Sequence, residues 1–192
     1  MTAATMKVYY DWGGSDGAPG TAHNVTDNGT NKVRFKQADN ATIDSNNPIP
    51  VPTSGSNYSY WKHMYLLVSA AEDMTQIDNV KFYSDGAVFD SYGGVDVFVA
   101  TATPIKTSAI DAGYDLADSA TALANHGSVS VATNANNYTS GSPLTVSISE
   151  SGNILDGTND TTDYVLINLK VGVTASSGTL TAESLVFQFD EV

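Results

Sequence analysis

Three histidines and four glutamates are the side chains of this 192-residue chain best suited to acid–base catalysis. His23, His63 and His126 do not stand at the spacing of a zinc site. Glycoside hydrolysis needs two converging carboxylates, and Glu150 and Glu183 are the residues that a jelly-roll hydrolase would use here. No glutamate is embedded in an aromatic strand face, so the sequence favours a non-enzymatic protein over a hydrolase.

The segment GGSDG at 13–17 matches the G-x-S-x-G nucleophile elbow of hydrolases. That motif requires a strand, a sharp turn and then a helix, whereas the residues that follow, APGTAHNVTDNGTN, are typical of a loop. We interpret the match as a glycine-rich turn. No other signal points to a Ser-His-Asp triad, and we expect no catalytic residue in this chain.

Two acidic loops offer the hard oxygen ligands that calcium prefers. They contribute Asp39, Asp44 and Asn46 in one loop and Asp156, Asn159, Asp160 and Asp163 in the other. Neither loop has the full spacing of an EF-hand, and Asp and Asn are also the residues that turns require. We therefore predict solvated turns, no metal site and no cofactor, with calcium left open as the alternative.

Aromatic side chains offer a third kind of chemistry, because their faces stack on the apolar faces of sugar rings. The candidates are Trp12, Tyr58, Tyr60, Trp61 and Tyr92. Aromatic residues at strand positions lie more often in a core or an interface. A carbohydrate-binding module is therefore the alternative function, and an exposed aromatic row would favour it.

The elements that must position these residues are strands, because apolar and polar residues alternate along most of the chain. Candidate strands cover 5–12, 31–36, 58–69, 77–84, 94–103, 127–133, 143–150, 162–174 and 179–190. No repeat or linker divides them. The pattern predicts a single all-β domain over 1–192, an antiparallel β-sandwich of jelly-roll type. One segment, 115–126, has helical spacing and predicts a short helix.

The clearest strand is DYVLINLKVGV, in which Val165, Ile167 and other alternate residues form one apolar face. Asn168 and Lys170 lie on the opposite face, which predicts a sheet that is wet on that side. The segment TASSGTL then turns the chain into ESLVFQF, and we expect these last two strands to pair as a closing hairpin.

The segment NNPIPVPTSGSNYSYWKHMYLLV at 46–68 has two parts. Prolines cannot donate hydrogen bonds to a strand ladder, so 48–52 predicts an extended edge segment. The run 58–69 is apolar on both faces, and a sandwich strand needs only one such face. The second face must be covered by a loop of this chain, by the helix or by another subunit, and a cover from within the chain is slightly favoured over an interface.

Composition excludes several classes of protein. Only 8 basic residues stand against 21 acidic ones, a net charge of −13, so a nucleic-acid partner is disfavoured. No apolar run approaches the length of a membrane span. The absence of cysteine excludes a disulfide framework, and the N-terminal residues carry no signal-peptide pattern. We expect synthesis in a cytoplasm.

The blocks NNPIPVPTSGSNYSYWKHMYLLV and IDNVKFYSDG, followed at the other end of the chain by GTLTAESLVFQFDEV, resemble structural proteins of tailed bacteriophages and prophages. The similar segments cover 46–86 and 162–192. The resemblance implies a non-enzymatic component of the virion, such as a head decoration (cement) protein or a minor capsid protein. A receptor-binding tail component is the variant that would bind carbohydrate.

A decoration protein made in the host cytoplasm would reside in the virion and would contact itself, as a homotrimer, and the major capsid protein. It would bind neither nucleic acid nor membrane. Symmetric contacts suit a strand with two apolar faces. The residues expected to make such contacts are Pro48, Pro50, Pro52, Trp61 and Tyr65.

Overall fold

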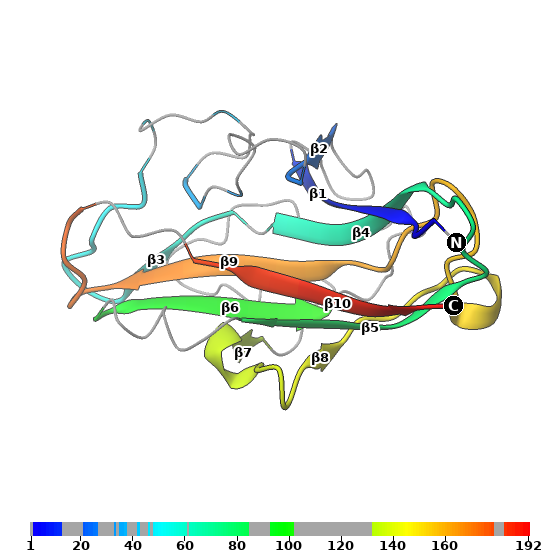
Figure 1. The fold of residues 1–192 in the computed structure, drawn as a ribbon. Helices are drawn as coiled ribbons and strands as arrows, with labels where there is room; N and C mark the ends of the chain where they lie inside the picture. The colour runs from blue at the N-terminus through cyan, green and yellow to red at the C-terminus, as the bar shows by residue number, and fades with distance from the viewer. Residues whose placement is uncertain are drawn as a thin grey trace.

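The computed structural model shows an all-β sandwich of two antiparallel sheets, as the alternation predicts (Figure 1). It describes residues 2–12, 21–26, 33, 35–37, 42, 46, 48–60, 62–84, 93–101, 132–178 and 183–192, with the backbone alone at 12, 21 and 101. No helix in these ranges is long and apolar enough to cross a bilayer. The predicted helix at 115–126 lies outside the described residues.

The larger sheet has seven strands. They are β1 (Thr5–Trp12), β2 (Thr21–Asn24), β3 (Ser56–Tyr58), β4 (Lys62–Ala70), β6 (Val95–Thr101), β7 (Thr133–Asn134) and β9 (Val165–Gly172). Their order is β2-β1-β4-β9-β6-β7, and β3 also pairs with β9. The strand β9 is therefore central, with partners on both of its edges.

The smaller sheet has three strands in the order β10-β5-β8. They are β5 (Ile77–Ser84), β8 (Leu144–Thr145) and β10 (Leu185–Glu191). Two 3₁₀ turns, η2 (Ala135–Asn137) and η3 (Ser151–Asn153), flank β8 in sequence. A jelly roll has eight strands in two Greek keys. The pairings of the described strands do not establish that topology, which stays a prediction.

The main core lies between the two sheets. Alternate residues of β4, β6 and β9 face the smaller sheet and are buried there: Met64, Leu66, Val68, Val95, Val97, Val99, Val165, Ile167, Leu169 and Val171. From the smaller sheet, the strand β5 contributes Ile77, Val80 and Phe82, and β10 contributes the half-buried Leu185, Phe187 and Phe189. This two-residue period is the physical basis of the sandwich, since each strand offers one apolar face to the core.

The predicted hairpin between the last two strands is wrong. The strand β10 pairs with β5 in the smaller sheet, whereas β9 lies in the larger one. Both edges of β9 are occupied by other strands, so no edge is left for β10. Their apolar faces therefore meet across the core, as Phe187 and Ile167 illustrate by belonging to the same cluster. Alternation reveals which face a strand buries but not which strand lies beside it.

The far face of the larger sheet, which points away from the smaller sheet, is also covered. His63, Leu166 and Asn168 on this face are fully buried, and Tyr65 and Tyr164 are nearly so. The prediction that β9 has one wet face is therefore wrong at Asn168, while Lys170 remains partly exposed. These side chains are buried within a single chain, so a second subunit is not required to cover them.

The run 58–69, expected as one strand, consists of two strands whose registers with β9 differ. In β3, Tyr58 is paired with Lys170, and in β4, Lys62 is paired with Ile167. Three residues, 59–61, separate Tyr58 from Lys62, whereas only two residues, 168 and 169, separate Ile167 from Lys170. This offset of one residue is that of a β-bulge.

Ser59 holds the two strands together at this offset. Its N–H donates to the Leu169 carbonyl at 2.9 Å, and its Oγ accepts from the Leu169 N–H at 3.0 Å. Because of the extra residue, Tyr58 lies on the far face together with His63 and Tyr65. The run 58–69 looks apolar on both faces because the extra residue at the bulge exchanges the faces on which alternate residues lie. A continuous strand would keep one alternation throughout.

Other predicted strands are shorter than expected or absent. Val33 and Phe35 in the segment 31–36 are described and lie outside any strand. In 143–150 only Leu144 and Thr145 form a strand, β8.

The two ends of the sandwich carry different segments of the chain. The two termini lie at one end, beside η3 (Figure 1). There the Ala4 N–H donates to the Glu191 carboxylate at 2.7 Å, and the Val192 N–H donates to the Gln76 carbonyl at 3.0 Å. The opposite end, which we call the distal end, carries the start of β3 and the turn that follows β9.

Gly94, at the start of β6, is a point of close approach at the distal end. Its carbonyl accepts from the Gly172 N–H at 2.7 Å, and its φ is +79°. A Cβ at this position would lie 2.5 Å from both the Ala175 nitrogen and the Thr174 Oγ1. The turn after β9 therefore leaves no room for a side chain at residue 94.

Gly94→Ala is expected to lower the free energy of unfolding by about 2 kcal/mol or more, since left-handed strain of about 1–2 kcal/mol adds to a backbone clash. Gly55→Ala is the matched control, because Gly55 has a φ of +69° but nothing within 4 Å of its Cβ position. Urea unfolding of both variants measures the difference. Equal losses would show that strain, and not close approach, determines the effect.

Candidate functional site

The proline arm, residues 48–52, lies outside any strand and is largely exposed at the distal end (Figure 1). Pro48 and Pro50 are exposed and Pro52 is partly buried. The Asn57 side-chain amide donates to the Pro50 carbonyl at 2.8 Å, which ties the arm to β3. This hydrogen bond holds the arm against β3, while the extended edge conformation expected from the prolines stays a prediction.

Exposed apolar side chains accompany the arm. Val51 is 37% exposed, and Val173, in the turn after β9, is 50% exposed. The pairing of Ser56 with Gly172 brings the segments that carry them to the same end of the sheet. Among the described residues, the one other exposed large apolar side chain is Val192, near the termini. The distal end thus carries two of the three exposed large apolar side chains of the described residues.

The other two predicted contact residues have different places. Tyr65 is 3% exposed and lies inside the far face of the larger sheet, between Tyr9 and Tyr164. It is therefore part of the interior and contributes no contact surface. Trp61 lies outside the described residues.

A buried polar cluster surrounds Tyr65. The Asp11 carboxylate on β1 accepts hydrogen bonds from the Tyr65 hydroxyl at 3.2 Å and from the Tyr164 hydroxyl. The His63 ring packs edge-on against Tyr164 at 5.3 Å, and His63 is the cross-strand partner of Asp11. We call Asp11, His63, Tyr65 and Tyr164 the Asp11 cluster. It joins β1, β4 and the residues that lead into β9.

The Asp11 cluster contains the residue types of an acid–base site, but its geometry is that of a structural element. Asp11 is 3% exposed, and His63 is fully buried. A general base must lie within hydrogen-bonding reach of a bound substrate. Because Asp11 is enclosed and accepts from the two tyrosine hydroxyls, the arrangement satisfies a buried carboxylate and helps to hold β1 on β4.

Two of the eight basic side chains are also buried. Lys62 is fully buried beneath the Tyr10 ring, with its Nζ 5.6 Å from the ring centroid. Lys36 is 4% exposed, and its Nζ donates to the Thr42 carbonyl at 2.9 Å. The carboxylates of Asp11 and Asp163 are buried too, so the buried charges of the described residues balance and the exterior keeps the acidic excess of the composition.

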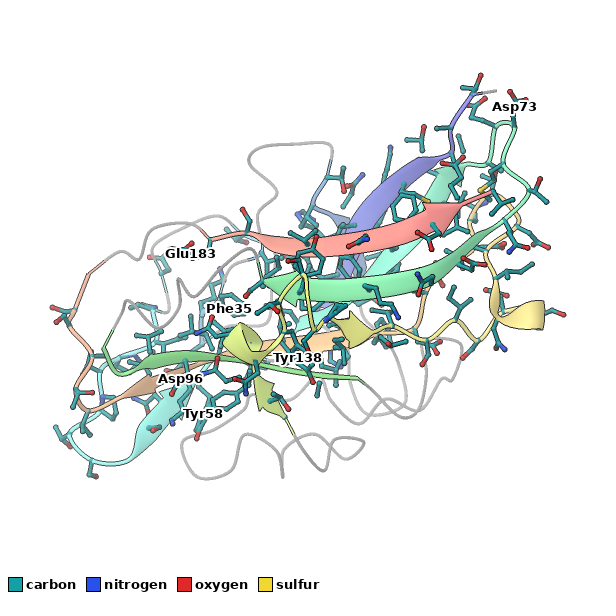
Figure 2. The ribbon with its side chains drawn as sticks, turned by 60° about the horizontal axis from the view of Figure 1, so that its bottom comes forward. Phe35, Tyr58, Asp73, Asp96, Tyr138 and Glu183 are labelled. Carbon is teal, nitrogen blue, oxygen red and sulfur yellow. The ribbon has the colours of Figure 1, made fainter. Side chains whose placement is uncertain are left out.

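Six residues form two neighbouring rows of cross-strand partners on the far face near the distal end. Strand pairing places Asp96, Lys170 and Tyr58 in one row across β6, β9 and β3. The next row contains Asn134, Phe98 and Asn168 across β7, β6 and β9. We call these six residues the Lys170 patch. Tyr58 and Asp96 lie at the end of the sheet remote from Asp73 (Figure 2).

The Lys170 patch contains an ion pair between Lys170 and Asp96. The Lys170 Nζ lies 3.2 Å from the Asp96 carboxylate and 5.7 Å from the centroid of the Phe98 ring. The Asn134 amide also donates to Asp96 at 3.3 Å. The side chains of Lys170 and Asp96 are 30% and 34% exposed, so this part of the patch is open to solvent.

The residues proposed for hydrolysis do not come together. Glu150 precedes η3, which lies beside the termini (Figure 1). Glu183 precedes the opposite end of β10, and a strand of this length spans roughly 20 Å. The carboxylates of glycoside hydrolases are much closer than this.

The acidic loop at 156–163 is organised as a turn. The Asp160 carboxylate accepts from the backbone N–H groups of Asp156 and Gly157, at 3.0 and 2.7 Å. Asp163 is buried and accepts from the Ser149 hydroxyl at 2.7 Å. Over the part of the chain that the structure describes, no three His, Asp or Glu side chains form a group that could hold a metal.

The sequence did not indicate the Lys170 patch, because its members lie on four strands and come together through register alone. The alternation predicts that Asn168 and Lys170 share one face of their strand, and this is the only indication of the patch that the sequence contains. Of the aromatic residues considered for sugar binding, Tyr58 and Tyr60 are both partly buried, and they do not form an exposed row. The side chains of Trp12, Trp61 and Tyr92 lie outside the described residues.

Comparisons of the chain with protein-family models, with curated proteins and with solved structures return no match.

Proposed function

We propose that the chain is a non-enzymatic structural protein of a virus particle, most specifically a head decoration or minor capsid protein. The observation that carries the proposal is the distal end, where the proline arm exposes Val51 and the turn after β9 exposes Val173. Such a surface suits repeated contacts with copies of the chain and with a major capsid protein. Many weak contacts of this kind add through multivalency.

The rest of the surface is less suited to contacts. The strand β10 is the edge of the smaller sheet, but its ladder has an irregularity between Gln188 and Asp190. Asp190 and Glu191 also place charge on this edge, and both features discourage strand addition. The acidic exterior disfavours nucleic acid and keeps particles apart. The arm is thus the preferred contact, in a homotrimer or on the capsid.

The oligomer prediction is tested by light scattering coupled to size-exclusion chromatography. We expect a trimer for the wild-type chain and a shift toward monomer for the double variant Val51→Asp, Val173→Asp, because two charges then enter the contact. Val192→Asp is the matched control, since Val192 is 62% exposed at the other end of the sandwich. A wild-type monomer at high concentration would contradict a preassembled trimer.

The virion assignment itself needs a separate measurement. Particles are purified on a density gradient from lysates of cells that carry the gene, and their peptides are quantified by mass spectrometry. We expect the chain to co-migrate with the major capsid protein at a fixed ratio. If the chain stays in the soluble fraction while capsids band normally, it is not a virion component.

A further inference from the structure

The Asn168 side chain is a buried amide whose hydrogen-bonding capacity is not used. Asn168 is fully buried, and neither its Oδ1 nor its Nδ2 has a hydrogen-bond partner within the chain. Most buried amides are bonded, and an unbonded one calls for an explanation, such as a bound water or ligand. This amide lies in the middle of the Lys170 patch, beside Phe98 and on the same face as Lys170.

The surroundings of Asn168 determine which ligand chemistry fits. Phe98 and Tyr58 supply half-buried aromatic rings, whose faces can stack on the C–H groups of a sugar ring. Asp96 provides carboxylate oxygens that accept from hydroxyls, and Lys170 and Asn134 provide donors. The charges of Lys170 and Asp96 cancel locally. Because the chain carries a net charge of −13, an anionic ligand would be repelled.

Lys170 lies over part of the patch. The Lys170 Nζ lies over the Phe98 ring, 5.7 Å from its centroid, and Phe98 is the cross-strand partner of Asn168. Lysine has a long, flexible side chain, and this one is 30% exposed. Its rotation away from Phe98 would uncover more of the ring, whose cross-strand neighbour is Asn168.

We propose that the Lys170 patch is a binding site for one unit of a neutral glycan. The sugar ring stacks on Phe98, its hydroxyls bond to Asp96 and Asn134, and one hydroxyl reaches the Asn168 amide when Lys170 rotates away from the ring. Tyr58, on the other edge of β9, borders the site. A structural protein with this site would bind glycans through its far face, and its distal end would remain available for contacts with other copies of the chain. The site does not depend on the virion assignment.

The test uses the full chain and a panel of methyl glycosides of glucose, galactose, mannose, fucose and N-acetylglucosamine, with glucuronic acid as the anionic counterpart. Binding is followed by the backbone amide shifts in nitrogen-15 NMR spectra. We expect at least one neutral glycoside to shift resonances of β6 and β9 around the patch, and glucuronic acid to bind at least about tenfold more weakly.

Two variants assign the binding to the patch. Asn168→Leu removes the amide and is expected to weaken binding at least about tenfold, while the fold is retained because no bond of the chain is lost. Phe98→Leu removes the stacking ring and provides an independent variant. Lys81→Met is the matched control, since Lys81 bonds to Thr145 in the smaller sheet. Absence of shifts with every neutral glycoside, or equal binding by Asn168→Leu and wild type, overturns the proposal.

Discussion

Replacing Asp11 by alanine is expected to lower the free energy of unfolding by about 3 kcal/mol, because two buried hydroxyls lose their acceptor and each loss costs about 1–3 kcal/mol. The hydroxyls are those of Tyr65 and Tyr164, both nearly inaccessible to solvent. Water cannot readily replace the carboxylate in so enclosed a position. Urea unfolding followed by tyrosine fluorescence measures the loss.

Asp11→Asn is the matched control for this prediction. The amide keeps the shape of the carboxylate, its oxygen still accepts from one tyrosine, and its nitrogen can donate to the other hydroxyl. We expect a clearly smaller loss than for alanine. Tyr65→Phe and Tyr164→Phe, alone and combined with Asp11→Ala, complete a double-mutant cycle. Additive losses throughout the cycle would mean that the three groups do not act as one unit.

Phe82→Ala is expected to cost about 3–5 kcal/mol, the range for a large aromatic side chain removed from a packed core. Phe82 is fully buried on β5, and its ring lies 5.0 Å from that of Phe187 on β10, in an edge-on arrangement. It fills the space between the two sheets, so truncation leaves a cavity that neither sheet can close without moving.

The companion variant Phe187→Ala removes a ring of the same size that is only half buried. We expect a loss of roughly half that of Phe82→Ala, since less apolar area is returned to water. Thermal and urea unfolding of the two variants give the comparison. If Phe187→Ala were as costly as Phe82→Ala, the edge of the smaller sheet would be more important to stability than its burial indicates.

The sequence predicts the strands well where the alternation is uninterrupted. The ranges 5–12 and 77–84 coincide with β1 and β5, and the all-β sandwich follows from them. The prediction fails where a strand changes its period, as at 58–69. No single residue signals that change, because serine, tyrosine and tryptophan suit a regular strand equally well.

Strand partners and sites formed by register could not be predicted in the same way. Lys170 and Asp96 are 74 positions apart in sequence, and only the pairing of β6 with β9 brings them together. The proline arm could be predicted, since proline excludes a ladder hydrogen bond locally. The apolar face of its strand predicts Tyr65 as a contact residue. Its hydrogen-bond partner in the interior, Asp11, is 54 positions away in sequence, so the burial of Tyr65 cannot be predicted locally.

The junction at Ser59 has a consequence for how this gene tolerates change. With one codon fewer between Tyr58 and Lys62, one of the two flanking strands would present the wrong face along its whole length. Amino-acid replacements at the same place alter one side chain and leave the frame of every other residue intact. A library of variants should therefore contain many functional replacements here, yet hardly any functional deletions. We therefore expect the length of this short segment to be constrained more strictly than its composition.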